Sequence, residues 1–357
     1  MLLAAGYGER LLPLTLTVPK PLLPVLGRPL APQVLRGLAR QGIDEAVINL
    51  HHLPAALEAA LGDGRELGLR RLHYSLEPDR LLGTGGGLMH ASAALRGSGT
   101  ILVRNADFLA DIPLARVLAS HRASAKIATL VVVPHRSGYT PVELDRDGGI
   151  ARFGGRGDGA AALAGSFLFT GFHLIEPAVL DLLPRGRPSD IVKDVYFGLA
   201  AEGRLHAFVH DGFWWEFGAP REYLEGSMQL LELPTDARVH LGEFDPVRKI
   251  KGSVAAVGAG VDLRACGIAI EGRAVLGFGT RVDRDARIED SVVMPEAWIG
   301  PGARLRRAII GPGAEIPAGT VVEDAMAATD VRPGAPLPPG TERHDRLLVR
   351  GLDGRAR

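Results

Sequence analysis

The chain has little cysteine, few aromatic side chains and no excess of either charge. Its single cysteine, Cys266, excludes a disulfide within the chain. Lys and Arg together number 41, as do Asp and Glu, so the formal net charge is +0 and no overall field attracts nucleic acid or an anionic membrane. Any affinity for phosphate groups must therefore come from the local placement of basic side chains and backbone N–H groups.

Long apolar runs are also lacking, and the first residues do not have the pattern of a signal peptide. The strongest apolar run, at residues 127–133, has the length of a strand and is far shorter than the roughly 18 residues of a membrane-spanning helix. The start shows no signal-peptide pattern, so we expect a cytoplasmic protein with no membrane or nucleic-acid partner. At 357 residues, 46% of them hydrophobic, the chain has enough material for two domains.

Up to residue 232, strand patterns alternate with helical patterns. Such alternation is typical of Rossmann-like α/β units around a mostly parallel sheet, in which ligands bind beyond the carboxyl ends of the strands. We therefore expect an α/β domain at residues 1–232. Helices are predicted from Leu30 to Gly42 and from Pro54 onward. Strands are predicted at 2–5, 46–50, 72–75, 100–103, 127–133 and 167–170.

After residue 235 the pattern changes, because apolar positions recur every six residues and Ile-Gly-Pro-Gly-Ala occurs at both 299–303 and 310–314. A period of six is typical of a parallel β-helix, whose turns stack on one another. We expect this fold at residues 236–325, followed by a tail at 326–357 whose periodicity is too weak to assign a fold. The recurring apolar positions are Val282, Ile288, Val293, Ile299, Leu305, Ile310, Ile316 and Val322.

The segment after the first predicted strand has several features that suit phosphate groups. Gly6 and Gly8 have no Cβ, so the N–H groups between Ala5 and Arg10 can turn toward an anion. Arg10 and Lys20 add full positive charges, which stabilise the negative charge that builds on a leaving pyrophosphate. The spacing matches neither the dinucleotide-binding motif nor the P-loop.

The whole stretch at 3–30 resembles the signature of the nucleotidyltransferases that make NDP-sugars from an NTP and a sugar 1-phosphate. Residues 15–22, together with the six-residue repeat, are most similar to the mannose-1-phosphate guanylyltransferase branch of that family. The resemblance implies a left-handed β-helix, Mg²⁺ as cofactor, and GTP and mannose 1-phosphate as substrates. It also implies that Arg10 and Lys20 are catalytic and that Ala5, Gly6 and Gly8 bind the nucleotide.

Two carboxylates are the candidate Mg²⁺ ligands. Asp107 follows a predicted strand, where a carboxylate can hold Mg²⁺ beside phosphate groups. The family writes Asn-Gly-Asp where this chain has Asn105, Ala106 and Asp107, and alanine would be strained if the backbone there needs a positive φ. The resemblance makes Glu216 the second ligand, in place of the family's Asp. The alternatives are a turn-capping role for Asp107 and a salt bridge for Glu216.

The glycine-rich segment at 83–87 matches the family loop that cradles the base and the ribose. The match implies nucleotide contacts for Gly83, Thr84 and Gly85, and the alternative is a flexible turn before a helix. Glu77 can accept hydrogen bonds from the N1–H and N2–H₂ edge of guanine, although an ordinary surface carboxylate is the other reading.

The family's sugar contacts are only partly present. Residues 170–172, Thr-Gly-Phe, match its Thr-Gly element, which implies that Gly171 meets the sugar together with Asn105 and Glu216. The family's Glu-Lys-Pro segment is absent, so Arg152 or Arg156 is left to bind the sugar phosphate, unless both are solvated loop residues.

Three functions remain open from the sequence. A sugar-1-phosphate nucleotidyltransferase, forming a homo-oligomer through the β-helix, is the leading interpretation. Ala106, Glu216 and the missing Glu-Lys-Pro segment favour a regulatory protein that binds a sugar nucleotide without making one. An acyltransferase seated on the β-helix is disfavoured, because such enzymes rely on a histidine base and residues 241–343 contain no histidine.

Overall fold

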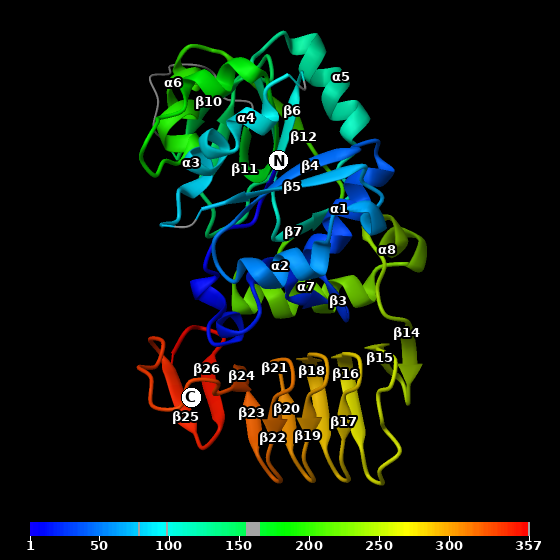
Figure 1. Cartoon of the computed structure of the whole chain (residues 1–357). Helices are drawn as coiled ribbons and strands as arrows, with labels where there is room; N and C mark the ends of the chain where they lie inside the picture. Colours follow the sequence, from blue (N-terminus) through cyan, green and yellow to red (C-terminus); the bar gives the residue numbers. More distant parts are fainter. Residues whose placement is uncertain (78, 98, 155–164, 356–357) are drawn as a thin grey trace. The chain divides into compact units, whose positions relative to one another are not determined.

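Short aliphatic strands joined by helices form the first of the two units into which the chain divides (Figure 1). This unit comprises Met1–Gly6 and Leu35–Trp214, and the second comprises Tyr7–Val34 and Trp215–Arg357. The computed structural model describes residues 1–77, 79–97, 99–154 and 165–355. Residues 7–34 and 215–232, which the sequence pattern assigns to the α/β domain, group with the β-helix in the second unit.

The main sheet of the first unit has the strand order β10-β9-β11-β6-β1-β4-β5. Its centre is parallel: Leu2 of β1 pairs with Ile48 of β4 on one side and with Arg104 of β6 on the other. The expected α/β fold is confirmed. The strands of this unit are β1 (Leu2–Leu3), β4 (Glu45–Leu50), β5 (Arg71–Leu76), β6 (Ile101–Asn105), β7 (Phe108–Ala110), β8 (Ala128–Pro134), β9 (Pro141–Leu144), β10 (Ile150–Phe153), β11 (Gly165–Ile175) and β12 (Leu205–Val209).

The helices have boundaries that follow from the local sequence. In α1 (Leu30–Arg40), Leu30, Val34 and Leu38 recur at helical spacing and are buried. α2 (Pro54–Leu61) begins with proline at its first position, where a missing N–H breaks no helical hydrogen bond. Residues 30–34 of α1 belong to the second unit and residues 35–40 to the first. The first unit also contains η4 (Arg65–Leu67), α3 (Gly83–His90), α4 (Ser92–Leu95), α5 (Leu114–Ser124), η5 (Pro177–Leu182), η6 (Val192–Tyr196) and α6 (Phe197–Ala201).

The β-helix of the second unit stacks parallel strands side by side (Figure 1), and from β17 onward its repeat is 17 residues. Trp298 pairs with Glu315, and Arg304 pairs with Val321, each one turn further along the chain. Each such turn consists of two steps of six residues and one step of five. This explains why Ile288 and Val293, and also Leu305 and Ile310, are five residues apart rather than six. The recurring apolar positions predicted from the sequence are all buried, so the β-helix prediction is confirmed.

Tight corners between the strands place residues in the left-handed region of the backbone. Gly302 and Gly313, in the two Ile-Gly-Pro-Gly-Ala copies, have φ values of 66° and 61°, which glycine adopts without a steric penalty. Asp290, Arg307 and Asp324 occupy another corner, with φ values of 42°, 48° and 48°. Arg307 Nε donates to Asp324 Oδ1 at 2.8 Å, so an ion pair links the same corner in successive turns.

The tail, to which the sequence pattern assigns no fold, forms a β-hairpin. β25 (Thr341–His344) pairs antiparallel with β26 (Leu347–Gly351), and β26 pairs antiparallel with β24 (Ala325–Thr329) of the last turn. The hairpin thereby covers one edge of the β-helix, which limits edge-to-edge association there. The remaining elements are η1 (Glu9–Leu11), η2 (Leu14–Leu16), η3 (Lys20–Leu22), β2 (Pro24–Val25), β3 (Arg28–Pro29), β13 (Trp214–Glu216), α7 (Pro220–Glu232), α8 (Thr235–Leu241), β14 (Val247–Ile250), β15 (Ser253–Val257), β16 (Ala269–Leu276), β17 (Arg281–Val282), β18 (Arg287–Val293), β19 (Trp298–Ile299), β20 (Arg304–Arg306), β21 (Ile309–Ile310), β22 (Glu315–Ile316) and β23 (Val321–Glu323).

Candidate functional site

The candidate residues of the first unit follow the carboxyl ends of its parallel strands. Ala5 comes after β1, Glu77 comes directly after β5, and Asp107 comes after β6. These strands are parallel neighbours, so their carboxyl ends meet at one edge of the sheet. That edge is where open α/β sheets bind their ligands.

Asn105 and Gly171 lie against each other at this edge. Asn105 is the last residue of β6, and the neighbouring Arg104 pairs with Phe172 of β11. Gly171 has a φ of 79°, and a Cβ added there would lie 2.6 Å from Asn105 Nδ2. Glycine is therefore required both for the backbone conformation and for the close approach. The structure brings these two predicted sugar-binding residues together.

The turn that carries Asp107 does not need the glycine of the family pattern. Ala106 is buried, and it is absent from the described residues that have a positive φ. The buried Arg104 holds this turn, because its Nη2 donates to Phe108 O at 2.7 Å and its Nε donates to Asn105 O at 3.2 Å. Burial lowers the pKa of Arg104 to about 9, and the charge of Asp107 opposes that shift. Alanine at position 106 thus introduces no left-handed strain.

The glycine-rich segment forms the start of α3 and packs on residues 187–191. Ser189 O accepts the N–H groups of Gly85 at 2.9 Å and Gly86 at 3.3 Å, while Thr84 Oγ1 accepts the N–H of Ile191 at 3.0 Å. A Cβ at Gly83 would lie 2.6 Å from Ser189 O. Close packing within the protein thus accounts for these glycines. Contacts of Gly83, Thr84 and Gly85 with a nucleotide remain a prediction.

Glu77 is only 1% exposed, so the reading of this residue as an ordinary surface carboxylate is wrong. Its Oε1 accepts from Asn49 Nδ2 at 2.8 Å, and its Oε2 accepts from the N–H of Leu82 at 2.8 Å. Asn49 was not identified from the sequence as a residue of this site, although its position within an apolar run could have indicated it. A polar side chain at the end of the apolar run 46–50 is costly to bury unless it is hydrogen-bonded.

Three charged side chains of the second unit converge around Gly218. Arg10 Nη2 donates to Glu216 Oε1 at 3.0 Å, with the two side chains 64% and 19% exposed. A Cβ at Gly218 would overlap Glu216 Oε1 and lie 2.7 Å from Arg10 Nη2 and 3.0 Å from Lys20 Nζ. The predicted catalytic pair is therefore assembled beside Glu216. The salt bridge that the sequence left open as an alternative for Glu216 is present.

The two glycines of the candidate phosphate-binding segment, residues 5–10, have different surroundings. Gly8 has a φ of 68°, and a Cβ there would lie 2.8 Å from Thr15 Cγ2 and 3.1 Å from Lys20 Cβ. Thr15 Oγ1 also donates to Gly8 O at 3.0 Å. A Cβ at Gly6, by contrast, would meet nothing within 4 Å. Gly8 is required by the turn itself, whereas Gly6 leaves open space beside it.

The candidate arginines for the sugar phosphate fall in different parts of the chain. Arg152 forms an ion pair with Glu143, with Nε 2.6 Å from Oε2, and both side chains are partly buried. Arg156 lies outside the described residues. A role for either in binding the sugar phosphate remains a prediction.

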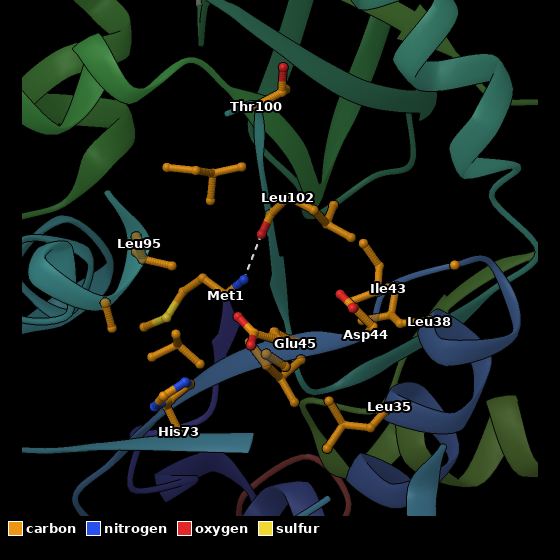
Figure 2. Close-up of a pocket in the computed structure, with 16 residues that line it drawn as sticks. Met1, Leu35, Leu38, Ile43, Asp44, Glu45, His73, Leu95, Thr100 and Leu102 are labelled. Carbon is orange, nitrogen blue, oxygen red and sulfur yellow. Dashed lines mark hydrogen bonds between the residues drawn. The ribbon is translucent and has the colours of Figure 1, made fainter. Parts of the chain in front are cut away.

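A cavity of about 220 Å³ in the first unit lies away from the carboxyl edge of the sheet. Figure 2 shows Met1, Glu45, Thr100 and Leu102 around it, at the amino ends of β1, β4 and β6. The Met1 amino group donates to Leu102 O at 2.6 Å. Because ligands of open α/β sheets bind at the opposite edge, this cavity is not the predicted nucleotide site.

Two family models match successive parts of the chain. Residues 1–232 match the model described as nucleotidyl transferase, and residues 250–330 match the GlmU-like C-terminal hexapeptide model. The chain is 32% identical to the mannose-1-phosphate guanylyltransferase of Mycobacterium tuberculosis, over 90% of this chain and 82% of the relative. It is 28% identical to the UTP–glucose-1-phosphate uridylyltransferase of Synechocystis, over 85% of each chain.

A solved structure also has a similar fold. The crystal structure of HddC from Yersinia pseudotuberculosis superposes with a TM-score of 0.53 at 18% sequence identity, covering 64% of this chain and 97% of that one. At that identity the likeness concerns the fold alone.

Proposed function

The chain belongs to the nucleotidyl transferase family, and on that premise we propose that it transfers a nucleotidyl group from an NTP to a sugar 1-phosphate, releasing pyrophosphate. The observation that carries this proposal is the convergence of Arg10, Lys20 and Glu216 around Gly218. We propose GTP and mannose 1-phosphate as the substrates, because the Mycobacterium tuberculosis relative has that named activity and matches 90% of the chain.

The proposed reaction needs positioning and charge stabilisation rather than a covalent enzyme intermediate. A phosphate oxygen of the sugar 1-phosphate attacks the α-phosphorus of the NTP in line, and the bond to the pyrophosphate oxygen breaks. Arg10 and Lys20 stabilise the negative charge that develops on the departing pyrophosphate. In the structure the Arg10 guanidinium donates to Glu216, with Nη2 3.0 Å from Oε1.

We propose Mg²⁺ as the cofactor. Asp107 and Glu216 would hold the ion, because carboxylate oxygens are the ligands that Mg²⁺ prefers. Within the described ranges, no group of three or more His, Cys, Asp or Glu side chains could hold a metal ion. When bound, the ion would supply positive charge to the phosphate oxygens.

Pyrophosphate release by the purified protein tests the proposal. Four NTPs are crossed with mannose, glucose, N-acetylglucosamine and heptose 1-phosphates in the presence of Mg²⁺, and we expect release with one pair. Silence across the grid, together with tight binding of an NDP-sugar, would replace this proposal with the regulatory sugar-nucleotide-binding protein. Arg10 and Lys20 favour the enzyme, because binding a product does not require a clamp for pyrophosphate.

We also propose that the chain forms a homo-oligomer through the β-helix. In the described part of the chain, β23 pairs only with β20, and Val321 of β23 is 61% exposed. An unpaired strand edge can pair with another chain. Sedimentation over a dilution series tests this, and a monomer at every concentration would contradict it.

From the sequence pattern we propose domains at residues 1–232 and 236–325. We also propose a cytoplasmic location, from the same pattern. No helix of the described residues combines the length and the apolar character needed to cross a membrane.

A further inference from the structure

A buried chain of hydrogen bonds connects the ends of three neighbouring strands in the first unit. Asn49 of β4 accepts the N–H of Ala4, just after β1, with Oδ1 at 2.8 Å. Its Nδ2 donates to Oε1 of Glu77, just after β5, at 2.8 Å. Oε2 of Glu77 then accepts the N–H of Leu82, directly before α3, at 2.8 Å. The end of β1 is thereby connected to the start of α3.

The two side chains of this connection are almost fully enclosed. Asn49 is 3% exposed and Glu77 is 1% exposed. Helix α3 packs directly on them, because a Cβ at Gly87 would lie 2.7 Å from Asn49 Nδ2 and 2.9 Å from Glu77 Oε1. Gly87 has no positive φ, so the lack of a side chain there is explained by space alone.

Because Asn49 and Glu77 are buried, only one orientation of each side chain satisfies all of their hydrogen bonds. A buried carboxylate is strongly unfavourable unless donors satisfy it, and a buried amide must satisfy both its oxygen and its nitrogen. Asn49 can do so only with its oxygen toward Ala4 and its nitrogen toward Glu77. Each partner therefore fixes the orientation of the next.

We propose that Asn49 and Glu77 are positioning residues, which hold the end of β1 at Ala4 and the start of α3 in one fixed relation, so that a nucleotide at the carboxyl edge of the sheet meets both. This inference rests on the proposed function. It assigns Glu77 to the protein's own framework, since both carboxylate oxygens are bound to protein donors and the side chain is enclosed. The preference among nucleobases is then set elsewhere.

The pattern of donors and acceptors allows two single variants to be compared with a double variant that restores the hydrogen bonds. Glu77→Gln must direct an NH₂ group at either Asn49 Nδ2 or the N–H of Leu82, so two donors face each other and one bond is lost. Asn49→Asp directs a second carboxylate at Glu77. In the double variant, the new carboxylate at position 49 accepts from Ala4 N–H and from the new amide at position 77, whose oxygen accepts from Leu82 N–H. The net charge is unchanged.

We expect each single variant to melt at a lower temperature and to raise KM for every NTP by a similar factor, about tenfold for one lost buried hydrogen bond. Amide hydrogen exchange at Leu82 should accelerate in both single variants. The double variant should regain the wild-type exchange rate and most of the affinity for NTPs. Exchange and melting need no turnover, so they test the connection even if the proposed reaction fails.

Two results would overturn the inference. One is a Glu77→Gln variant that changes the preference among NTPs while Leu82 exchange stays at the wild-type rate, because Glu77 would then contact the base. The other is a double variant that is no better than the single variants in melting and exchange. If the single variants do not fold, folding of the double variant supports the connection, and failure of the double variant to fold contradicts it.

Discussion

Replacing Gly218 with alanine should disperse the charged cluster of the second unit without unfolding it. The new methyl group would overlap Glu216 Oε1 and crowd Arg10 Nη2 at 2.7 Å and Lys20 Nζ at 3.0 Å, so these side-chain ends must move. All three are the ends of flexible side chains, and Gly218 has no positive φ. We therefore expect the free energy of unfolding to change by less than about 1 kcal/mol.

The expected loss of activity follows from the number of donors displaced. One preorganised donor aimed at developing charge is worth about 3 to 4 kcal/mol, or roughly 100-fold to 1000-fold in turnover. Gly218→Ala displaces two candidate donors that can partly readjust. We expect kcat for pyrophosphate release to fall about 100-fold at saturating substrate.

The matched control is Gly37→Ala in α1, where a Cβ meets nothing within 4 Å. It should leave kcat unchanged and stabilise the protein by about 0.5 to 1 kcal/mol, because alanine is the better helix former. Both variants are compared by pyrophosphate release and by thermal melting. A Gly218→Ala enzyme that retains wild-type kcat would refute the role assigned to this cluster.

Lys20→Ala should lower kcat by roughly 100-fold while the melting temperature stays the same, and turnover near the wild-type rate would contradict a catalytic role. Burial lowers the pKa of His173 from its ordinary 6.5 to about 3, so the folded protein keeps this ring neutral. Stability is then fully present above pH 6.5 and declines as the pH falls toward 3, and denaturant titrations should show a shallower pH dependence for His173→Gln. Ile299→Ala, at a fully buried position of the β-helix, should cost about 2 to 5 kcal/mol in chemical denaturation. Val239→Ala, at an exposed position of α8, should cost less than about 0.5 kcal/mol, and equal effects of these two variants would contradict the assigned interior.

The sequence predicted those parts of the fold whose evidence is local. Ile299 and Ile316 could be assigned to an interior because each belongs to a repeat of six residues, and both are completely buried. The strand at 46–50 was evident from its apolar run and is observed as β4. The tail hairpin was not predictable in this way, because β26 is defined by its pairing with β24 rather than by a periodicity of its own.

The sequence identified candidate residues of the site, but it did not predict which other residues they contact. The glycines at 83–87 suggested a loop open to a ligand, yet Gly85 packs on Ser189, more than 100 positions away. From the sequence, Glu77 was interpreted either as a residue that binds the nucleobase or as a surface residue. Its partner Asn49 could not be recognised, because only the pairing of β4 with β5 brings the two residues together. Such partners depend on strand order, which a single sequence does not reveal.

The 17-residue turn of the β-helix has a consequence for how this part of the chain can change in length. Deleting one residue within a strand would move its buried positions to the exposed face, unless a local irregularity absorbs the change, as the register shift between Glu271 and Ala274 of β16 does. Duplicating or removing a whole turn keeps all faces in alignment and changes the length by about 4.8 Å, the spacing of neighbouring strands. Whole turns can therefore be added to or removed from this domain without changing which side chains of the other turns are buried.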